Sequence, residues 1–144
     1  MVTATGRVSQ PGDEGVTVCD ATARFDLDND QAPVWINYTG GDSVWSTAVT
    51  GAAVYVQGHF RWLNSINGFT STCPPATDTE GCVVRKGVGA IDPQTGRALS
   101  WNPPKPAQIS GEQFLATQTG LWIASDSRLI AGEDRRGLTF MPLP

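Results

Sequence analysis

Apolar and polar residues alternate over short stretches along the whole chain, and glycine, proline or aspartate separates one stretch from the next. Two of these stretches, residues 44–50 and 53–60, meet at Gly51-Ala52 and predict a β-hairpin, because Val, Trp, Thr and Tyr pack well on a half-buried sheet. A weaker copy of this pattern runs from residue 113 to 126. No long run carries a helical period. The pattern therefore predicts an all-β chain organised around two hairpins.

Shorter runs of the same kind predict the remaining strands, at residues 2–8, 21–27, 33–38, 87–91, 97–101 and 137–141. Residues 92–96, Asp-Pro-Gln-Thr-Gly, predict a tight turn. In this turn Asp92 accepts hydrogen bonds from the following backbone amides, and Gly96 adopts the left-handed conformation. Residues 64–84 are expected to form an irregular polar excursion.

The strand pattern also repeats. Residues 23–26 align with 89–92 and residues 33–35 with 99–101, and both matches are 66 positions apart. Thr50-Gly51 matches Thr119-Gly120, residues 54–56 match 121–123, and residues 137–140 resemble 87–91. Without the excursion the period is about 45–50 residues, which is typical of a four-stranded blade of a β-propeller.

Composition and charge narrow the class of protein. The chain has 144 residues, with 16 glycines and 10 prolines, which suits one all-β domain rich in turns. Its net charge is −4 and its ten Lys and Arg are scattered, so no nucleic-acid partner is expected. No apolar run approaches the roughly 18 residues that span a bilayer. The first residues lack the pattern of a signal peptide.

Four segments carry a family resemblance: TAVTGAAVYVQGHF (47–60), AIDPQTG (90–96), WNP (101–103) and LTFMPL (138–143). They resemble the C-terminal blades of uncharacterised secreted actinobacterial β-propeller proteins with kelch-like or delta-60-like repeats. The resemblance covers nearly all of residues 19–143 and implies a secreted or cell-surface scaffold, often found beside carbohydrate-binding modules. It carries over no catalytic residue. The chain departs from the family at Gln57-Gly58, where a blade usually has Gly-Gly, and in lacking the upstream blades.

Read as blades, residues 1–144 are expected to form a single propeller-type repeat region. Residues 1–41 supply outer strands of a preceding blade, 42–103 form one blade with an inserted loop near 64–84, and 104–144 give three strands of the next. About two and a half blades are too few to close a ring. The open edges favour either self-association or pairing with missing upstream blades.

The three cysteines leave alternatives open. A disulfide between Cys73 and Cys82 would close a polar loop of about ten residues and contribute roughly 2–3 kcal/mol. Cys19 is then left over, and three unrelated thiols are the alternative. Zinc is a poor fit because the chain has no Cys-x-x-Cys pair and one distant histidine.

One segment has the Asp-x-Asp-x-Asp start of a calcium loop, at Asp26, Asp28 and Asp30. The sixth position of that loop is Gln31 rather than Gly, and the twelfth is Asn37 rather than Glu. A turn with solvated carboxylates is therefore favoured over a metal site. We expect no metal and no cofactor.

Two sets of side chains are candidates for binding or chemistry. Trp62 and Arg61, beside the insertion, together with Asp42 and Glu112, are the candidate ligand-binding residues, because aromatic faces suit the apolar faces of sugars. Loop carboxylates near a channel, at Asp42, Glu112 or Asp126, are the candidates for hydrolysing a glycosidic bond.

Other residues suit structural roles. Trp35 and Trp101 occupy equivalent repeat positions, which predicts packing between blades. His59 is the only histidine, and no Gly-x-Ser-x-Gly motif accompanies it, so we expect a structural role for this residue. The sequence thus predicts a non-enzymatic extracellular binding or scaffold module for a glycan or cell-surface polymer. The alternative is part of a propeller-fold glycoside hydrolase or lyase.

Overall fold

The computed structural model describes residues 2–4, 20–28, 32–66, 81–103, 105–106 and 111–142. Within these ranges every regular element is a β-strand, every strand pair is antiparallel and no helix occurs, which confirms the all-β prediction. The described residues accordingly include no helix with the length and hydropathy to cross a membrane.

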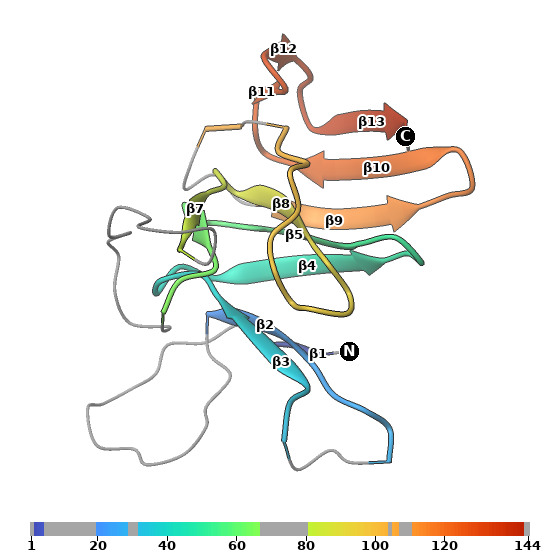
Figure 1. Cartoon of the computed structure of the whole chain (residues 1–144). Coiled ribbons are helices and arrows are strands. Elements are labelled where there is room, and N and C mark those ends of the chain that lie inside the picture. Colours follow the sequence, from blue (N-terminus) through green and yellow to red (C-terminus); the bar gives the residue numbers. More distant parts are fainter. Residues whose placement is uncertain are drawn as a thin grey trace.

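Three three-stranded sheets follow one another along the chain, from blue at the bottom to red at the top of Figure 1. The N-terminal sheet contains β1 (Val2–Ala4), β2 (Ala21–Arg24) and β3 (Trp35–Tyr38), in that order. The central sheet contains β4 (Val44–Val49), β5 (Val54–Gly58) and β8 (Val88–Ile91). The C-terminal sheet contains β9 (Gly111–Ala116), β10 (Gly120–Ser125) and β13 (Leu138–Pro142), with β10 in the middle.

Two short strand pairs accompany these sheets. β6 (Trp62–Leu63) pairs with β7 (Val83–Val84), and β11 (Leu129–Ile130) pairs with β12 (Glu133–Asp134). Neither pair was predicted, because two-residue strands leave no measurable alternation in the sequence. The first pair closes the base of the polar excursion, whose residues 67–80 lie outside the described ranges.

The central and C-terminal sheets contain the same hairpin in the same register. Each residue of β4 and β5 has its counterpart 67 positions later in β9 and β10, as in the pairs Ala48–Tyr55 and Leu115–Trp122. Both hairpins also carry a β-bulge at the same place. A bulge inserts one extra residue into one strand and increases the local twist. The extra residue is Trp45 in one hairpin and Glu112 in the other.

The third strands of these two sheets are equivalent as well, at a spacing of 50 residues. Val54 pairs with Ile91 in the central sheet, and Leu121 pairs with Met141 in the C-terminal sheet. The glycines that precede the third strands, Gly87 and Gly137, both have a positive φ, of 70° and 78°. The structure therefore shows an internal repeat of three strands.

The hairpin turns correct one detail of the predicted alignment. The structure matches Thr50 with Thr117, not with Thr119. In each turn the threonine hydroxyl bonds both the amide and the carbonyl of the residue three positions later, Ala53 or Gly120. Thr50 and Thr117 therefore close the two turns at equivalent positions. Gly51 and Gly120, on which the sequence match relied, do not occupy equivalent positions.

The middle strand of the central sheet is buried on both faces. Every residue of β5 is buried, and successive side chains of a strand point to opposite faces. The core between the central and N-terminal sheets contains Trp35, Val44, Val54, Val56, Phe60, Leu63 and Ile91. The core between the central and C-terminal sheets contains Ala53, Tyr55, Val88, Ala90, Phe114, Leu121, Ile123 and Ile130.

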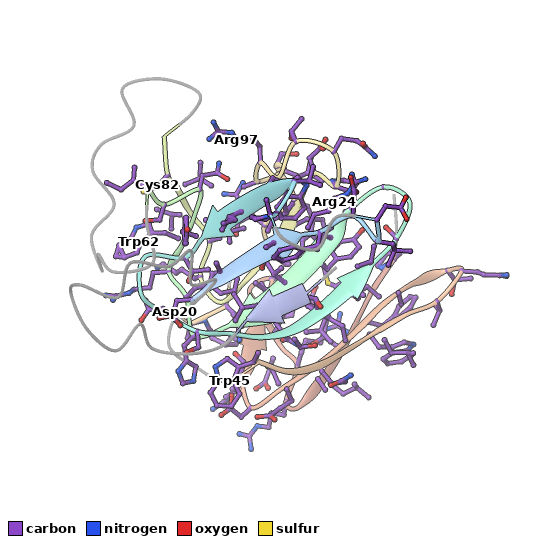
Figure 2. The ribbon with its side chains drawn as sticks, turned by 90° about the horizontal axis from the view of Figure 1, so that it is seen from below. Asp20, Arg24, Trp45, Trp62, Cys82 and Arg97 are labelled. Carbon is purple, nitrogen blue, oxygen red and sulfur yellow. The ribbon has the colours of Figure 1, made fainter. Side chains whose placement is uncertain are left out.

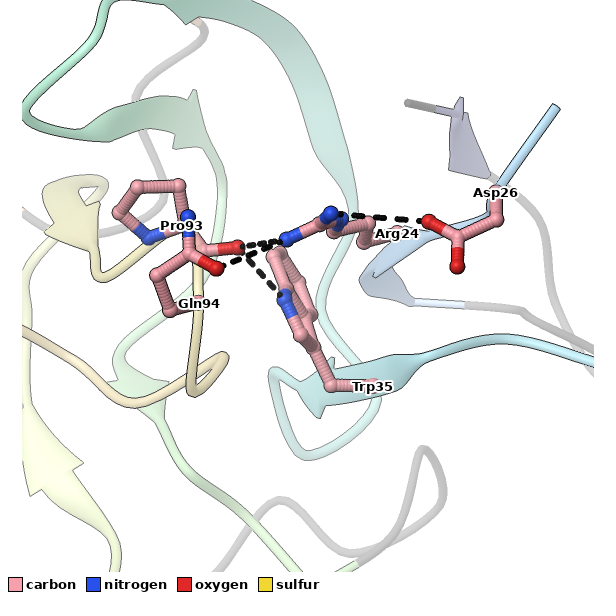
Figure 3. A network of polar contacts seen from close by, with 5 residues as sticks. All are labelled: Arg24, Asp26, Trp35, Pro93 and Gln94. Atoms are coloured by element: carbon pink, nitrogen blue, oxygen red, sulfur yellow. Dashed lines mark hydrogen bonds and ion pairs between the residues drawn. The ribbon is translucent and has the colours of Figure 1, made fainter.

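The N-terminal sheet is attached to the central sheet through the turn at residues 92–96. Figure 3 shows that the Arg24 guanidinium and the Trp35 indole both donate hydrogen bonds to the carbonyl oxygen of Pro93, at 2.9 and 3.1 Å. A Cβ on Gly96 would lie 2.6 Å from ring atoms of Trp35, and Gly96 has a φ of 72°. The turn therefore needs glycine at this point.

The same turn confirms the predicted role of Asp92. Its Oδ1 accepts hydrogen bonds from the amides of Gln94 and Thr95, both at 2.8 Å. These backbone hydrogen bonds lower the pKa of Asp92, because they favour the charged carboxylate.

The predicted strand at residues 97–101 is reduced to a single bridge between Ile91 and Ala98, made by hydrogen bonds from the amide of Leu99 to the carbonyl of Ala90 and from the amide of Asp92 to the carbonyl of Arg97. Trp101 instead turns toward Tyr55, and their rings meet edge to face with centroids 5.0 Å apart. Trp35 is 9% exposed within the other core. Both tryptophans pack between sheets, as their equivalent positions in the repeat predicted.

Candidate functional site

The polar rim is the set of side chains, in two contact groups, that come from the segments where β4 begins and β5 ends, at one end of the central sheet. It consists of Asp42, Trp45, His59, Arg61 and Trp62. Figure 2 shows Trp45 and Trp62 on the side of the molecule away from Arg24. Residues 42–45 supply one half of the rim and residues 59–62 supply the other.

Arg61 connects the first group of rim residues. Its Nε lies 3.0 Å from Oδ2 of Asp42, and its Cζ lies 4.7 Å from the centre of the Trp62 ring. The Asp42 side chain is 19% exposed and the Arg61 side chain 34%. A cation held over an aromatic face and paired with a carboxylate has little freedom, so the guanidinium is fixed in place before any ligand arrives.

Trp45 and His59 form the second group. Trp45 is the extra residue of the bulge and is 50% exposed, and its ring lies 5.1 Å from that of His59 at an interplanar angle of 37°. The amide of His59 donates to the carbonyl of Ser43, at 3.0 Å. A Cβ on Gly58 would lie 2.1 Å from the same carbonyl oxygen. Glycine at 58 therefore allows the two strands to approach closely, and the bulge turns Trp45 outward.

The backbone beneath the rim is held by Asp20, which is buried and has a φ of 49°. Its carbonyl oxygen accepts a hydrogen bond from the amide of Thr39, at 2.9 Å, and its Oδ1 accepts one from the Ser43 hydroxyl, at 3.3 Å. The loop that carries Asp42 is thus tied to the N-terminal sheet, so the rim is built on a supported loop.

Glu112 lies elsewhere. It is the exposed bulge residue of β9, in the position equivalent to Trp45, and its charge acts on Lys105. Lys105 is only 3% exposed, and burial lowers its pKa to about 8 although Asp126 and Glu112 act in the opposite direction. A Cβ on Gly87 would lie 2.4 Å from Cε of Lys105, so this glycine makes room for the lysine.

The structure therefore divides the four predicted ligand-binding residues. It joins Asp42, Arg61 and Trp62 through direct contacts, and it gives Glu112 a different charged neighbour. The three candidate catalytic carboxylates are divided in the same way, since Asp42 pairs with Arg61 while Glu112 and Asp126 both act on Lys105.

The calcium-like segment does not assemble in the described residues. Asp26 forms an ion pair with Arg24 at 3.5 Å, Asp28 is exposed, and Asp30 lies outside the described ranges. Across the part of the chain that the structure describes, no group of three or more His, Cys, Asp or Glu side chains is placed to hold a metal ion.

The predicted disulfide stays a prediction. Cys82 is 9% exposed and precedes β7. Cys73 and Cys19 both lie outside the described residues.

Sequence reasoning missed two features of this region. It preferred Trp62 to Trp45 as a binding residue because a bulge leaves no local mark in a strand pattern, although a Trp in the first strand and a His in the second, at the open end of a predicted hairpin, were a usable signal. It also gave no role to Lys105, which is a buried cation. Burial of a lysine depends on contacts with residues distant in the chain.

Comparisons of the chain with protein-family models, with curated proteins and with solved structures give no match. The interpretation of the site therefore depends on its own geometry.

Proposed function

We propose that this protein is a non-enzymatic binding module of the cell surface or extracellular space, and that its polar rim binds a glycan or another cell-surface polymer. The observation that carries this proposal is the fixed Arg61, which pairs with Asp42 and lies over the Trp62 ring. The location rests on the resemblance to secreted propeller proteins.

The composition of the rim suits a polyhydroxylated ligand. Indole rings offer flat apolar surfaces for the C–H faces of a sugar ring, and paired guanidinium and carboxylate groups offer donors and acceptors for its hydroxyls. A binding site commonly combines aromatic surface with a few fixed polar groups. Both kinds of group are present here, and the contacts among them hold them in place.

The scaffold proposal rests on the internal repeat. The central and C-terminal sheets share their register, their bulge and their turn, which supports interpreting them as blades of a β-propeller. The N-terminal sheet then supplies the outer strands of a preceding blade. Three sheets are too few for a closed ring, so we propose that the scaffold associates with further sheets of the same kind.

The alternative function is glycoside hydrolysis or elimination by loop carboxylates. It requires two carboxyl groups that flank one bond. Asp42 is held by Arg61, whereas Glu112 and Asp126 share the buried Lys105, so Asp42 is separated from the other two carboxylates by its partner. This arrangement favours binding without turnover.

The test is a titration of the purified protein with a panel of neutral and acidic oligosaccharides, followed by calorimetry. We expect Trp62→Ala and Arg61→Ala each to weaken the binding of a recognised sugar by about tenfold or more, which corresponds to about 1.4 kcal/mol. Val49→Ala, which removes an exposed apolar side chain at the end of β4 away from the rim, is the control for tryptophan, and Arg135→Ala, which removes an exposed pair with Glu133, is the control for arginine. Both controls are expected to bind as the wild type does.

The outcomes separate the two functions. Absence of binding to every sugar of the panel, or equal losses in the control variants, would contradict the proposal. Release of reducing ends by the wild type, abolished by Asp42→Asn or Glu112→Gln, would instead establish the hydrolase.

A further inference from the structure

The outer face of the C-terminal sheet is an uncovered apolar surface. Its side chains come from alternate positions of the three strands, and none is charged: Gln113, Leu115, Trp122, Ala124, Leu138 and Phe140. Leu115 is 61% exposed, Leu138 56% and Trp122 38%, and the rings of Trp122 and Phe140 lie 5.0 Å apart. An open hollow of about 250 Å³ lies on this face.

The repeat shows what normally covers such a face. The strand registers make Leu115, Trp122, Leu138 and Phe140 equivalent to Ala48, Tyr55, Val88 and Ala90 of the central sheet. Those central residues pack against the C-terminal sheet, in the core between the two sheets. The outer face of the C-terminal sheet is therefore the position at which another sheet of the same kind would pack.

The outer face is also larger and more apolar than its covered counterpart. At each of the four positions the C-terminal sheet carries the bulkier side chain, with Leu for Ala, Trp for Tyr, Leu for Val and Phe for Ala. A surface that only had to meet water would gain nothing from these enlargements, whereas a surface that packs against a partner gains buried apolar area.

The three sheets limit which partner fits. The central sheet is covered on both faces at its middle strand β5. In the N-terminal sheet, Arg24 and Trp35 point toward the central sheet (Figure 3), so Ala21 and Ala23 point to the opposite face, and both are 0% exposed. Ile36 and Tyr38 of β3 share this face and are half-buried. Among these three sheets, as described, the outer face of the C-terminal sheet therefore exposes the most apolar side-chain surface.

We propose that two copies of this chain associate through the outer faces of their C-terminal sheets, related by a two-fold axis. A head-to-tail arrangement would need an open face on the N-terminal sheet of the neighbour, and that face is covered at β2. A two-fold arrangement needs one self-complementary surface, which an uncharged apolar face provides. The inference rests on the scaffold part of the proposed function and not on glycan binding, so the two tests fail independently.

Dimerisation would change how the module binds a polymer. Each copy contributes one polar rim, and the rim lies at the end of the central sheet rather than on the paired faces. Two rims on one dimer bind a repetitive polymer bivalently, which raises the apparent affinity without any new contact.

The experiment is size-exclusion chromatography with light scattering over a range of protein concentrations. The wild type is expected to reach twice the 15.3 kDa monomer mass as its concentration rises. Leu115→Glu and Trp122→Glu place a charge on the face and are expected to weaken dimerisation by about tenfold or more. The control is Val49→Glu, since Val49 is 53% exposed in β4 and does not belong to the face. Near-ultraviolet circular dichroism checks that each variant is folded.

Hydrogen exchange on the wild type gives a second readout that needs no variant. The amides of β10 and β13 are expected to exchange more slowly at high than at low concentration, while those of β2 stay unchanged. A wild type that stays monomeric at the highest concentration, or that forms an open-ended series of larger species, would overturn the proposal. A dimer that Val49→Glu weakens as much as Trp122→Glu does would overturn it equally.

Discussion

The central and C-terminal sheets have the same register, the same bulge and the same threonine turn, yet their surroundings differ. Tyr55 in the central sheet is 5% exposed, whereas its equivalent Trp122 in the C-terminal sheet is 38% exposed. The shared features depend on residues close together in the chain. The difference in exposure depends on whether another sheet packs on that face. The same local structure therefore contributes differently to stability in the central and in the C-terminal sheet.

The largest expected difference is between Tyr55→Ala and Trp122→Ala. Tyr55 contacts Trp101 and Phe114 in the core, so its loss leaves a cavity and lowers the free energy of unfolding by about 3–4 kcal/mol. Trp122→Ala removes a half-exposed ring and is expected to cost about 1 kcal/mol in the monomer. Urea denaturation at low protein concentration measures both. Equal losses would mean that the two sheets are buried alike.

The glycines before the third strands provide the second comparison. Gly87→Ala adds a Cβ that meets Cε of Lys105 and the carbonyl oxygen of Gly58, at 2.4 and 2.9 Å, and it also strains a left-handed residue. Gly137→Ala has the same backbone strain but meets no atom within 4 Å. We expect losses of about 2–3 kcal/mol for the first and about 1 kcal/mol for the second. Thermal unfolding of the two variants at one pH tests this, and a larger loss for Gly137→Ala would contradict it.

Lys105 gives a pH-dependent test of the packing around Gly87, because its side chain occupies the space beside that glycine. Its pKa falls from 10.5 to about 8 on folding, so between these two values the unfolded chain binds more protons than the folded one. The free energy of unfolding is therefore expected to rise by roughly 2 kcal/mol as the pH increases from 8 to 10.5, and to lack this contribution below pH 8.

The matched variant is Lys105→Met, which keeps the length of the side chain without its charge. Urea denaturation across this pH range should show a smaller rise for Lys105→Met, and a more stable variant below pH 8. Parallel pH profiles for wild type and variant would show that Lys105 is not the titrating group.

The two threonine turns are expected to behave alike. Thr50→Val and Thr117→Val each remove the side-chain hydrogen bonds that close a hairpin, which lowers the free energy of unfolding by about 1 kcal/mol. Thr119→Val is the control, since the sequence match had selected that residue instead. A larger loss of stability for Thr119→Val than for Thr117→Val would support the alignment of Thr50 with Thr119 that the sequence predicted.

The sequence predicted the features that are encoded locally. Alternation located the two hairpins, and the Asp92 to Gly96 turn has the predicted hydrogen bonds and left-handed glycine. The strand at 97–101 was overestimated, since it forms only one bridge and Trp101 packs on Tyr55 instead.

The candidate site was predicted in part. Arg61 and Trp62 are neighbours in sequence, so their contact was accessible to local reasoning, and Asp42 joins them across the start of the hairpin. The burial of Lys105 and the outward position of Trp45 depend on long-range packing and on a bulge, and neither leaves a periodic mark in the sequence.

The repeat also shows where this architecture tolerates change. The hairpins are 67 residues apart but the third strands only 50, so the connection between second and third strands is 17 residues longer in the central sheet. The register of the third strand is the same in both sheets despite this difference. New segments can therefore be inserted at this connection, by gene duplication and divergence or by protein engineering, while the sheets that carry them keep their pairing.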